Sequence, residues 1–490
     1  MNKKLHRMCM RLGASVLLGT MVFTSGCQQA GGRDVRLDPK NPVSIEIWHY
    51  YNGPQKNAFD EMISEFNDTV GLEEGIIVEA CSQGNVSELT EKVIDAANKK
   101  VGAGDIPDVF AAYADTALQV DKLGLVASLD DYLTDGELAE YIPEYIEEGR
   151  FDAQGSLKIF PIAKSTEVMM VNKTDWDKFS AATGADIEKI KTMEGLAGTA
   201  KQYYEWTDSL TPEPDDGKAF FGRDALANYF IIGCRQLGVE IFSVENGKVT
   251  FNLDKEVIRK LWDHYYVPFV HGYFAANGRF RSDDAKTGDI IALVGSTSGS
   301  AYFPDKVMVN DNEGYDIEPM VFEPPVFEGS ELYAVQQGAG MVVTKTDERR
   351  EYAATVFLKW FTDSERNIEF SVGSGYMPVK VAANDRDMVQ KVLQGSGEAV
   401  AEGLQKSLDV ALDMTKTHTL YTSKAFGGGT EARAVLEYSM ADLAKADSEQ
   451  VAQMVASGQS RQEAADGFCT DEHFEEWYQS FSGALEEAIQ

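Results

Sequence analysis

Residues 43–67 constrain the fold more than any other stretch of the chain, because they predict a strand, a turn and a helix in direct succession. Apolar and polar side chains alternate over residues 43–48, as in a short β-strand. The following helix has one apolar face with helical spacing, made of Phe59, Met62, Ile63 and Phe66. Such a unit opens a sheet with crossover helices, whose ligands bind at the carboxyl ends of strands. The sequence therefore predicts a binding loop at residues 48–54.

The same alternation of strands and helices continues to residue 130. We expect a second strand at residues 75–80, a helix at residues 88–100, and a third strand entered through residues 104–110. A short helix is predicted next, at residues 116–123. The order βαβαβ indicates a mostly parallel sheet covered by helices.

The N-terminus is typical of an exported lipoprotein. Four basic side chains precede an apolar run at residues 12–23 that is too short to cross ~30 Å of hydrocarbon. Thr24-Ser25-Gly26-Cys27 resembles a lipobox, although Leu is usual at its first position. We expect residues 1–26 to be a signal peptide, Cys27 to carry a lipid that holds the protein at the outside of the membrane, and residues 27–42 to be a tether. Cleavage elsewhere would release a soluble protein.

The composition narrows the classes of partner and cofactor. The chain has 490 residues, enough for two or three domains, and a formal net charge of −34. So acidic a surface argues against nucleic acid or an anionic bilayer as partner. Outside the signal and the lipobox stand Cys81, Cys234 and Cys469, widely spaced and without a CxxC pair. We expect buried free thiols, no metal site and no cofactor.

Several motifs in chain order carry a resemblance to a known family. They are the lipobox, Ile47-Trp48-His49, Glu65-Phe66-Asn67, Gly104-Asp105-Ile106-Pro107-Asp108-Val109, Phe160-Pro161-Ile162-Ala163, Val171-Asn172-Lys173, Gly338-Ala339-Gly340-Met341-Val342-Val343, Phe357-Leu358-Lys359-Trp360-Phe361, Gly375-Tyr376-Met377-Pro378-Val379 and residues 458–465. In this order the chain resembles the family 1 extracellular solute-binding proteins, the carbohydrate-binding lipoproteins of ABC importers. The motifs span nearly the whole chain.

The resemblance implies an α/β, two-lobed periplasmic-binding-protein-like fold. Each lobe would be a mostly parallel sheet flanked by helices, with the ligand between the lobes and a hinge of several crossings. The expected crossings lie near residues 163–166, 335–340 and 374–378. The expected lobes are residues 43–164 plus 338–375 and residues 165–337 plus 376–490.

A sugar site needs aromatic faces for the C–H surfaces of the ring and polar groups for its hydroxyls. Aromatic and ring candidates at the places where the family has its cleft are Trp48, His49, Tyr50, Tyr113 and Tyr376. For Trp48, Tyr50 and Tyr376 the alternative is core packing, and for His49 it is a hydrogen bond within the turn. A strand at residues 290–294 also enters a hydroxyl-rich loop with Thr297 and Ser298, which could bind a ligand or simply cap a helix.

A second set of residues matches the glycerol-3-phosphate-binding branch of the family. Its members are Ser165, Thr166, the serine-rich loop, Gly338, Tyr376 and Arg433. In that branch Arg433 would hold the phosphate with its fork of N–H donors, although it could equally be a solvated helix residue. The branch has a tyrosine near Val86 and a glutamate near Ala114, and this chain has neither. A carbohydrate is therefore the first expectation and a phosphorylated glycerol the second.

The resemblance implies a monomeric receptor that delivers its ligand to the transmembrane subunits of an ABC permease. The competing hypothesis from another class is a secreted carbohydrate-active enzyme or adhesin on a similar scaffold. Acidic residues are too abundant for any chosen pair to indicate a glycosidase. No GxSxG elbow, phosphate-binding loop or paired metal-ligand motif stands in the sequence, so we expect no catalytic residues.

Overall fold

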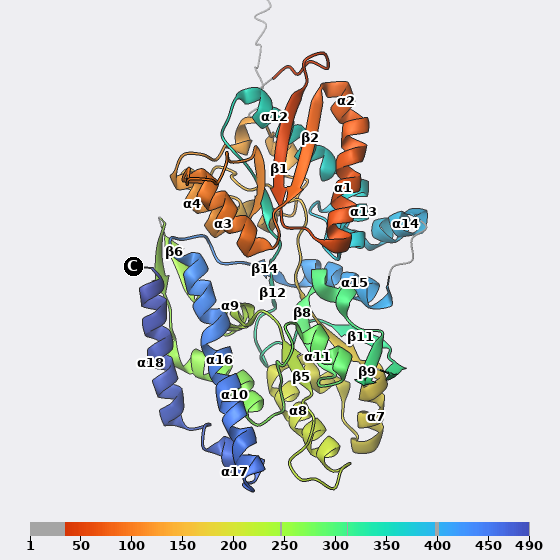
Figure 1. Ribbon diagram of the computed structural model, residues 1–490, viewed down its shortest axis with the longest axis vertical. Coiled ribbons are helices and arrows are strands. Elements are labelled where there is room, and N and C mark those ends of the chain that lie inside the picture. The colour runs from red at the N-terminus through yellow and green to blue at the C-terminus, as the bar shows by residue number, and fades with distance from the viewer. Residues whose placement is uncertain (1–34, 246, 311, 397–400, 490) are drawn as a thin grey trace, which may run out of the picture.

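The structure is a computed structural model that describes residues 35–489, except residues 246, 311 and 397–400. The expected signal segment, Cys27 and the first half of the expected tether lie outside the described residues. The described chain forms two lobes that lie one above the other along the longest axis of the molecule (Figure 1). No helix in these residues is long and apolar enough to cross a membrane.

The first lobe is built on a four-stranded sheet in the order β13-β3-β1-β2. Its strands are β1 (Val43–His49), β2 (Ile76–Ser82), β3 (Val109–Ala112) and β13 (Gly340–Val343). Strand β1 is parallel to β2 and β3, whereas β13 is antiparallel to β3. Every second side chain of β1 is buried, namely Val43, Ile45, Ile47 and His49. This is the period of two that a strand requires.

Helices flank this first sheet (Figure 1). They are α1 (Gly53–Asp68), α2 (Val70–Glu74), α3 (Val86–Ala97), α4 (Ala114–Lys122), α5 (Asp135–Leu138), α6 (Pro143–Glu148), α12 (Glu348–Phe361) and α13 (Ser364–Ser374), with the 3-10 turn η1 (Leu129–Asp131). Helix α1 has Pro54 in its first turn and buries the four apolar residues expected from the sequence. Helix α3 begins with a capping box between Asn85 and Glu88, which satisfies two backbone N–H groups at its start.

The second lobe has a four-stranded sheet in the order β11-β4-β8-β5. Its strands are β4 (Glu167–Asn172), β5 (Phe221–Arg223), β8 (Ala292–Ser296) and β11 (Pro319–Phe322). The expectation of a mostly parallel sheet needs correction here, because β4 is antiparallel to both neighbours and only β5 is parallel to β8. The direction of the chain explains this. Strand β4 leaves the hinge, whereas β8 runs toward it and ends where Thr297 donates its backbone N–H to the carbonyl of Thr166 (2.9 Å).

Two of the remaining elements, at residues 382–384 and 386–396, lie beside α13 of the first lobe (Figure 1), and most of the others surround the second sheet. The helices are α7 (Lys173–Thr183), α8 (Met193–Asp208), α9 (Leu226–Gln236), α10 (Lys255–Val270), α11 (Arg281–Thr287), α14 (Arg386–Ser396), α15 (Glu402–Thr417), α16 (Gly429–Ala456), α17 (Arg461–Asp466) and α18 (Asp471–Ala488), with 3-10 turns η2 (Ile187–Lys191), η3 (Thr297–Tyr302) and η4 (Ala382–Asn384). Two-stranded pairs are β6 (Phe242–Glu245) with β7 (Lys248–Phe251), β9 (Lys306–Asn310) with β10 (Glu313–Asp316), and β12 (Tyr333–Val335) with β14 (Thr419–Tyr421). The helices α16, α17 and α18 form one flank of this lobe (Figure 1).

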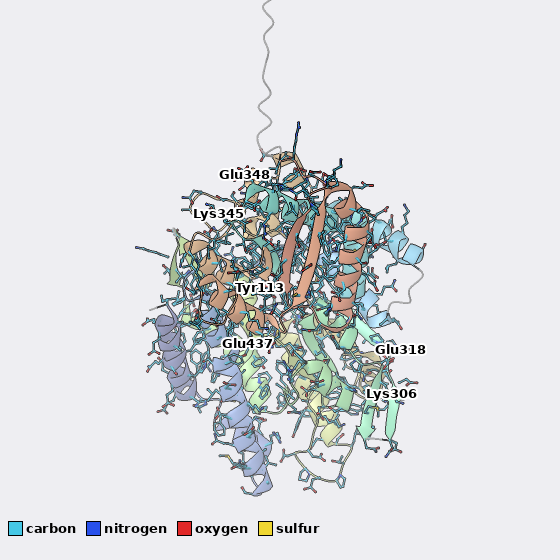
Figure 2. The ribbon with its side chains drawn as sticks, turned by 45° about the horizontal axis from the view of Figure 1, so that its top comes forward. Tyr113, Lys306, Glu318, Lys345, Glu348 and Glu437 are labelled. Atoms are coloured by element: carbon cyan, nitrogen blue, oxygen red, sulfur yellow. The ribbon has the colours of Figure 1, made fainter. Side chains whose placement is uncertain are left out.

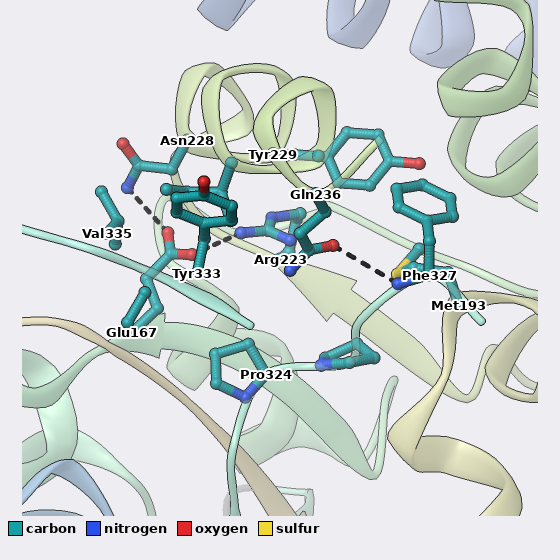
Figure 3. Close-up of a pocket in the computed structure, with 14 residues that line it drawn as sticks. Glu167, Met193, Arg223, Asn228, Tyr229, Gln236, Pro324, Phe327, Tyr333 and Val335 are labelled. Atoms are coloured by element: carbon teal, nitrogen blue, oxygen red, sulfur yellow. Dashed lines mark hydrogen bonds and ion pairs between the residues drawn. The ribbon is translucent and has the colours of Figure 1, made fainter. Parts of the chain in front are cut away.

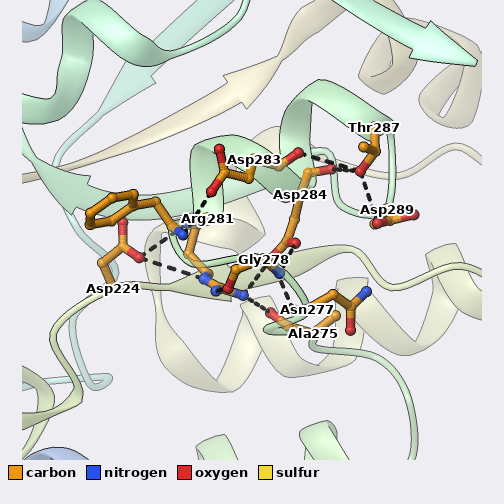
Figure 4. A network of polar contacts seen from close by, with 10 residues as sticks. Asp224, Ala275, Asn277, Gly278, Arg281, Asp283, Asp284, Thr287 and Asp289 are labelled. Atoms are coloured by element: carbon orange, nitrogen blue, oxygen red, sulfur yellow. Dashed lines mark hydrogen bonds and ion pairs between the residues drawn. The ribbon is translucent and has the colours of Figure 1, made fainter. Parts of the chain in front are cut away.

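A buried arginine holds the loop before α11 against the second sheet (Figure 4). Arg281 is 4% exposed and pairs with the carboxylates of Asp284 and Asp224. Its guanidinium also donates to the carbonyl of Gly278 (2.5 Å). The backbone N–H of Gly278 donates to Asp284 (2.6 Å), so the loop is fixed from both sides. The buried arginine is thus paired with carboxylates and hydrogen-bonded, as burial of a charge requires.

Three chain segments lie side by side where the lobes meet. Lys164 pairs with Met377, and Ser165 pairs with Gln337. Gly338 has a φ of +94°, and a Cβ there would lie 2.8 Å from the carbonyl oxygen of Ala163. Glycine is therefore required at this close approach. A further parallel pair, β12 with β14, lies beside these crossings and was not expected.

Each lobe has its own hydrophobic core. The core of the first lobe includes Tyr376, which lies within the third crossing, and Val379, which follows it. The lobe bounds expected from the sequence stay a prediction, and these two residues favour a second lobe that resumes a few residues later than 376. The three cysteines in the described residues are free, and Cys81 is exposed rather than buried.

Candidate ligand-binding site

A cavity of ≈ 700 Å³ lies between the two lobes. Helices α3 and α4 of the first lobe form one wall. The opposite wall comes from α9, the start of α16 and residues 422–426, and residues 335–337 of a crossing segment join the two. Figure 2 shows Tyr113, which lines this cavity, near the middle of the molecule where the lobes meet. Because both lobes contribute side chains, the cavity exists only in this relative position of the lobes.

The side chains that line the cavity are mostly polar. The aromatic members are Tyr113, Phe242 and Phe426, and the hydroxyl and amide members are Ser87, Thr90, Thr116, Gln119, Asn228, Gln336, Gln337, Thr422, Ser423 and Thr430. The charged members are Glu91, Asp95, Asp115, Glu148, Glu431, Lys100, Lys424 and Arg433. Convergent hydroxyl and amide groups can bind the hydroxyls of a ligand, and the excess of carboxylates favours a ligand without net negative charge.

Tyr113 is the expected aromatic residue that does line the cavity. It follows strand β3 directly and immediately precedes α4, with extended backbone angles. Its side chain is 39% exposed, unlike the core tyrosines of the first lobe. The carboxyl end of a strand thus presents an accessible ring to the cavity, which is the arrangement a sugar ring can stack on.

Arg433 reaches the cavity from the second turn of α16. Its Nη2 donates to Oδ1 of Asn228 on α9 (2.6 Å), and both residues line the cavity. The guanidinium therefore rests on a neutral amide and keeps its positive charge, with further N–H donors for a ligand oxygen.

The two lobes touch each other at one edge of the cavity through Asp115 on α4. The backbone N–H of Phe426 in the second lobe donates to Oδ1 of Asp115 (3.2 Å). Gly429, the first residue of α16, approaches so closely that a Cβ there would lie 2.4 Å from the same oxygen. Burial raises the pKa of Asp115 to about 6, although the Phe426 N–H and the nearby Arg433 oppose that rise.

A buried ion pair stands at the junction of the cavity and the hinge. Lys164 is 1% exposed, and its Nζ lies 2.6 Å from Oε2 of Glu148 and donates to the carbonyl of Gly338 (2.8 Å). The amide of Gln336 donates to the same carboxylate. A second cavity of ≈ 460 Å³ lies beyond Glu148 and Gln336 and shares these residues with the first. The ion pair thus ties a first-lobe helix to two crossing segments.

The sequence of this chain matches the family model described as "Bacterial extracellular solute-binding protein" over residues 61–393. This match covers more than half of the chain. The protein belongs to the family of bacterial extracellular solute-binding proteins.

Known proteins match this solute-binding protein over most of its length. The maltotriose-binding protein of Pyrococcus abyssi (strain GE5 / Orsay) is 22% identical over 362 residues, which is 73% of this chain and 71% of that protein. The structure of the cyclic alpha-maltosyl-1,6-maltose binding protein from Arthrobacter globiformis has a TM-score of 0.64 at 16% identity and covers 91% of this chain and 100% of its own. The structure of UgpB from Mycobacterium tuberculosis in complex with glycerophosphocholine has a TM-score of 0.63 at 17% identity, covering 92% and 100%. These likenesses show the same two-lobed α/β fold.

In this solute-binding protein a group of expected residues meets at the hinge rather than in the cavity. Ser165 and Thr166 lie on the first crossing, Thr297 and Ser298 on η3, and Tyr376 on the third crossing. Thr166 and Thr297 are 1% and 0% exposed, and within the described part of the chain their hydroxyls have no hydrogen-bond partner. The structure therefore brings these residues together next to Gly338, but none of them lines the cavity in this position of the lobes.

Tyr50 belongs to the same hinge group. Its hydroxyl lies 3.3 Å from the hydroxyl of Tyr376. Tyr376 is 4% exposed, and burial raises the pKa of its hydroxyl, so that it stays protonated at any physiological pH. This contact joins Tyr50 of the first lobe to the third crossing.

Trp48 and His49 pack within the first lobe, away from the residues that line the cavity. Trp48 is half-buried, and its indole N–H donates to Glu46 (2.8 Å). His49 is 0% exposed, and its Nδ1 accepts the backbone N–H of Tyr51 (3.1 Å). Burial lowers the pKa of His49 to about 4, so the ring is neutral. Trp48 thus packs against the core of the first lobe, and His49 accepts a hydrogen bond within its turn, as the alternatives to ligand binding predicted.

Sequence reasoning missed four polar residues of this region, namely Asp115, Glu148, Lys164 and Asn228. Two of them carry a recognisable signal. Lys164 directly follows the apolar run Phe160-Pro161-Ile162-Ala163 at an expected crossing, and Asn228 stands between apolar neighbours in α9. A lone polar side chain in an apolar run is buried by its neighbours, so it needs a partner.

Proposed function

We propose that this protein binds a carbohydrate, of one or several sugar units, in the cavity between its lobes. The observation that carries the proposal is a cavity of ≈ 700 Å³ whose hydroxyl, amide and aromatic side chains come from both lobes. That volume is within the range of sites for small-molecule ligands. Tyr113 would stack on a sugar ring, and the amides of Gln336 and Gln337 would bind its hydroxyls. The names of the relatives from Pyrococcus and Arthrobacter support a sugar ligand.

The proposed mechanism is closure of the lobes around the ligand. The cavity walls belong to different lobes, so a ligand that contacts both stabilises the closed arrangement by its differential affinity. Delivery of the bound ligand to the transmembrane subunits of an ABC permease, and tethering by a lipid on Cys27, complete the proposal. No chemical step on the ligand is part of it.

A phosphorylated glycerol is the second candidate ligand. One observation favours it: Arg433 presents a guanidinium to the cavity while hydrogen-bonded to a neutral amide. Such a group can bind phosphate oxygens with two parallel N–H donors. Against it stand the five carboxylates that line the same cavity, which repel a dianion. A zwitterionic diester would be repelled less than the monoester.

A thermal-shift screen tests both candidates. Residues 28–490 are screened against maltose, maltotriose and other sugars, sn-glycerol 3-phosphate and glycerophosphocholine. A ligand at about 100 times its Kd adds about 2.7 kcal/mol to the free energy of unfolding, a visible rise in melting temperature. We expect a sugar to give this rise and to be recovered unchanged. Conversion to a product would instead support the competing hypothesis of a carbohydrate-active enzyme.

Tyr113→Ala is the variant that tests the site. Loss of a stacking ring should weaken sugar binding about tenfold, since an aromatic contact contributes about 1.5 kcal/mol beyond burial of its area. The matched control is Tyr438→Ala, because Tyr438 is 60% exposed on α16 and does not line the cavity. Equal affinity of Tyr113→Ala and the control would contradict the site. A response to phosphorylated glycerols alone, lost in Arg433→Ala, would favour the second candidate.

A further inference from the structure

A row of buried, hydrogen-bonded polar side chains in the second lobe leads from Arg433 to the second sheet. Glu167, Arg223 and Asn228 are 3%, 8% and 1% exposed. Nη2 of Arg223 lies 2.5 Å from Oε2 of Glu167, and Nδ2 of Asn228 donates to Oε1 of the same carboxylate (2.8 Å). Figure 3 shows the carboxylate of Glu167 between these two partners. Each oxygen of the buried carboxylate thus has its own donor.

This arrangement fixes the orientation of the Asn228 amide. Because Nδ2 donates to Glu167, Oδ1 is left to accept Nη2 of Arg433 (2.6 Å). The opposite orientation of the amide would direct its N–H donors at the guanidinium and its oxygen at the carboxylate, and both contacts would be repulsive. The hydrogen bond to the carboxylate of Glu167 therefore determines that Arg433 faces the oxygen of the Asn228 amide and not its nitrogen.

The backbone on either side of this contact is also fixed. Asn228 lies near the start of α9, and Arg433 lies near the start of α16. One turn beyond Arg433, Oε2 of Glu437 accepts the backbone N–H of Ala227 (2.9 Å). The two helix starts are therefore joined next to the amide, which limits the positions that Arg433 can reach.

The charges of these buried side chains do not neutralise Arg433. Arg223 balances Glu167, so the buried group is neutral as a whole. Among the residues that the structure describes, Arg433 hydrogen-bonds to the neutral Asn228 and forms no ion pair. A carboxylate in the place of Asn228 would bind the guanidinium by a bidentate ion pair and compete with a ligand.

We propose that Asn228 is a positioning residue for ligand binding, oriented by the buried Glu167–Arg223 pair, and that it holds the guanidinium of Arg433, outside any ion pair among the described residues, as a hydrogen-bond donor for an oxygen-rich ligand. This rests on the proposed function, in that the cavity between the lobes is taken as the ligand site. Glu167 and Arg223 act through Asn228.

A double-mutant cycle tests the coupling between Asn228 and Arg433. Affinities for maltotriose and for glycerophosphocholine are measured by calorimetry in the wild type, Asn228→Ala, Arg433→Ala and the double variant. We expect Asn228→Ala to weaken binding about tenfold, as for a hydrogen bond to a charged group, and to cost nothing further once Arg433 is absent. Losses that simply add would show a general structural role and overturn the proposal. Asn228→Ser takes the place of Asn228→Ala in both experiments if the alanine variant does not fold.

A second readout needs no ligand. Phenylglyoxal, which reacts with accessible guanidinium groups, is applied to the ligand-free protein, and modification of Arg433 is followed by mass spectrometry. We expect Asn228→Ala to accelerate the reaction of Arg433 several-fold, while Arg279, which lies over Phe280, reacts at an unchanged rate. Unchanged reactivity of Arg433 would overturn the positioning role. If the wild type binds neither probe ligand, the ligand class of the proposed function fails, and this measurement still decides the role of Asn228.

Discussion

At the scale of single residues, Lys164 shows how a charge can be kept inside the hinge. Its ammonium lies 2.6 Å from Glu148 and also bonds to the carbonyl of Gly338, while its side chain is 1% exposed. Transfer of either ion alone from water would be costly, so each depends on the other. Because Glu148 also lines the cavity, this pair connects the stability of the hinge with the shape of the ligand site.

Lys164→Met is expected to lower the free energy of unfolding by about 3–5 kcal/mol, because it leaves Glu148 buried without its partner. Urea denaturation followed by tryptophan fluorescence measures the change. The double variant Lys164→Met/Glu148→Met should recover most of the loss, since it removes both charges. A single variant as stable as the wild type, or a double variant less stable than the single one, would contradict the account of this pair.

At the scale of elements, the contact between α4 and the start of α16 decides how the lobes meet. Asp115 stands in the first turn of α4 and accepts the N–H of Phe426 from the other lobe (3.2 Å). Gly429 allows the close approach, since a side chain there would collide with the carboxyl group. Among charged neighbours, Arg433 lowers the pKa of Asp115 and Glu431 raises it, but burial is the largest influence. Closure of the lobes therefore buries a titratable group.

Ligand affinity is expected to depend on pH through Asp115. In separated lobes its carboxyl would have an ordinary pKa, whereas in this structure burial raises the pKa to about 6. The closed arrangement thus binds the proton more tightly, and its penalty for a charged Asp115 disappears as the pH falls through about 6. Affinity for the ligand found in the screen should rise between about pH 7.5 and pH 5. In Asp115→Asn this rise should be absent, and a fall in wild-type affinity over the same range would contradict the prediction.

At the scale of the whole molecule, two lobes with separate cores are joined by three crossing segments and the β12–β14 pair. Each lobe can therefore stay rigid while the crossings absorb a rotation, and glycine at position 338 lets two crossings lie close together. This division suits a receptor that closes over its ligand.

The proposed tether is tested on the full chain in cells. Cys27→Ala should move the protein from the membrane fraction to the soluble extracytoplasmic fraction, because a lipid chain contributes about 0.8 kcal/mol for each CH₂ that it buries. Immunoblots of both fractions measure the distribution. Cys81→Ala is the control, since that exposed thiol lies outside the lipobox. Unchanged retention of Cys27→Ala in the membrane would contradict lipid tethering.

The sequence by itself determined the local elements and the order in which they occur. Short-range periodicity was sufficient for β1 and α1, whose buried residues are those with the expected spacing. Ordered motifs also predicted the family and the segments that meet as crossings. The strands and helices depend on neighbours within a few residues, and the family motifs can be recognised in one sequence without knowledge of the fold.

Only the tertiary structure decided which polar residues line the cavity. Trp48 and His49 follow the pattern of a binding loop, yet they pack within the first lobe, while Asp115 and Asn228, which were not expected at the site, line the cavity from α4 and α9. The direction of β4 likewise follows from where the chain crosses the hinge. The physical reason is that a site between two lobes joins residues hundreds of positions apart, and its members are selected by the packing of one lobe against the other.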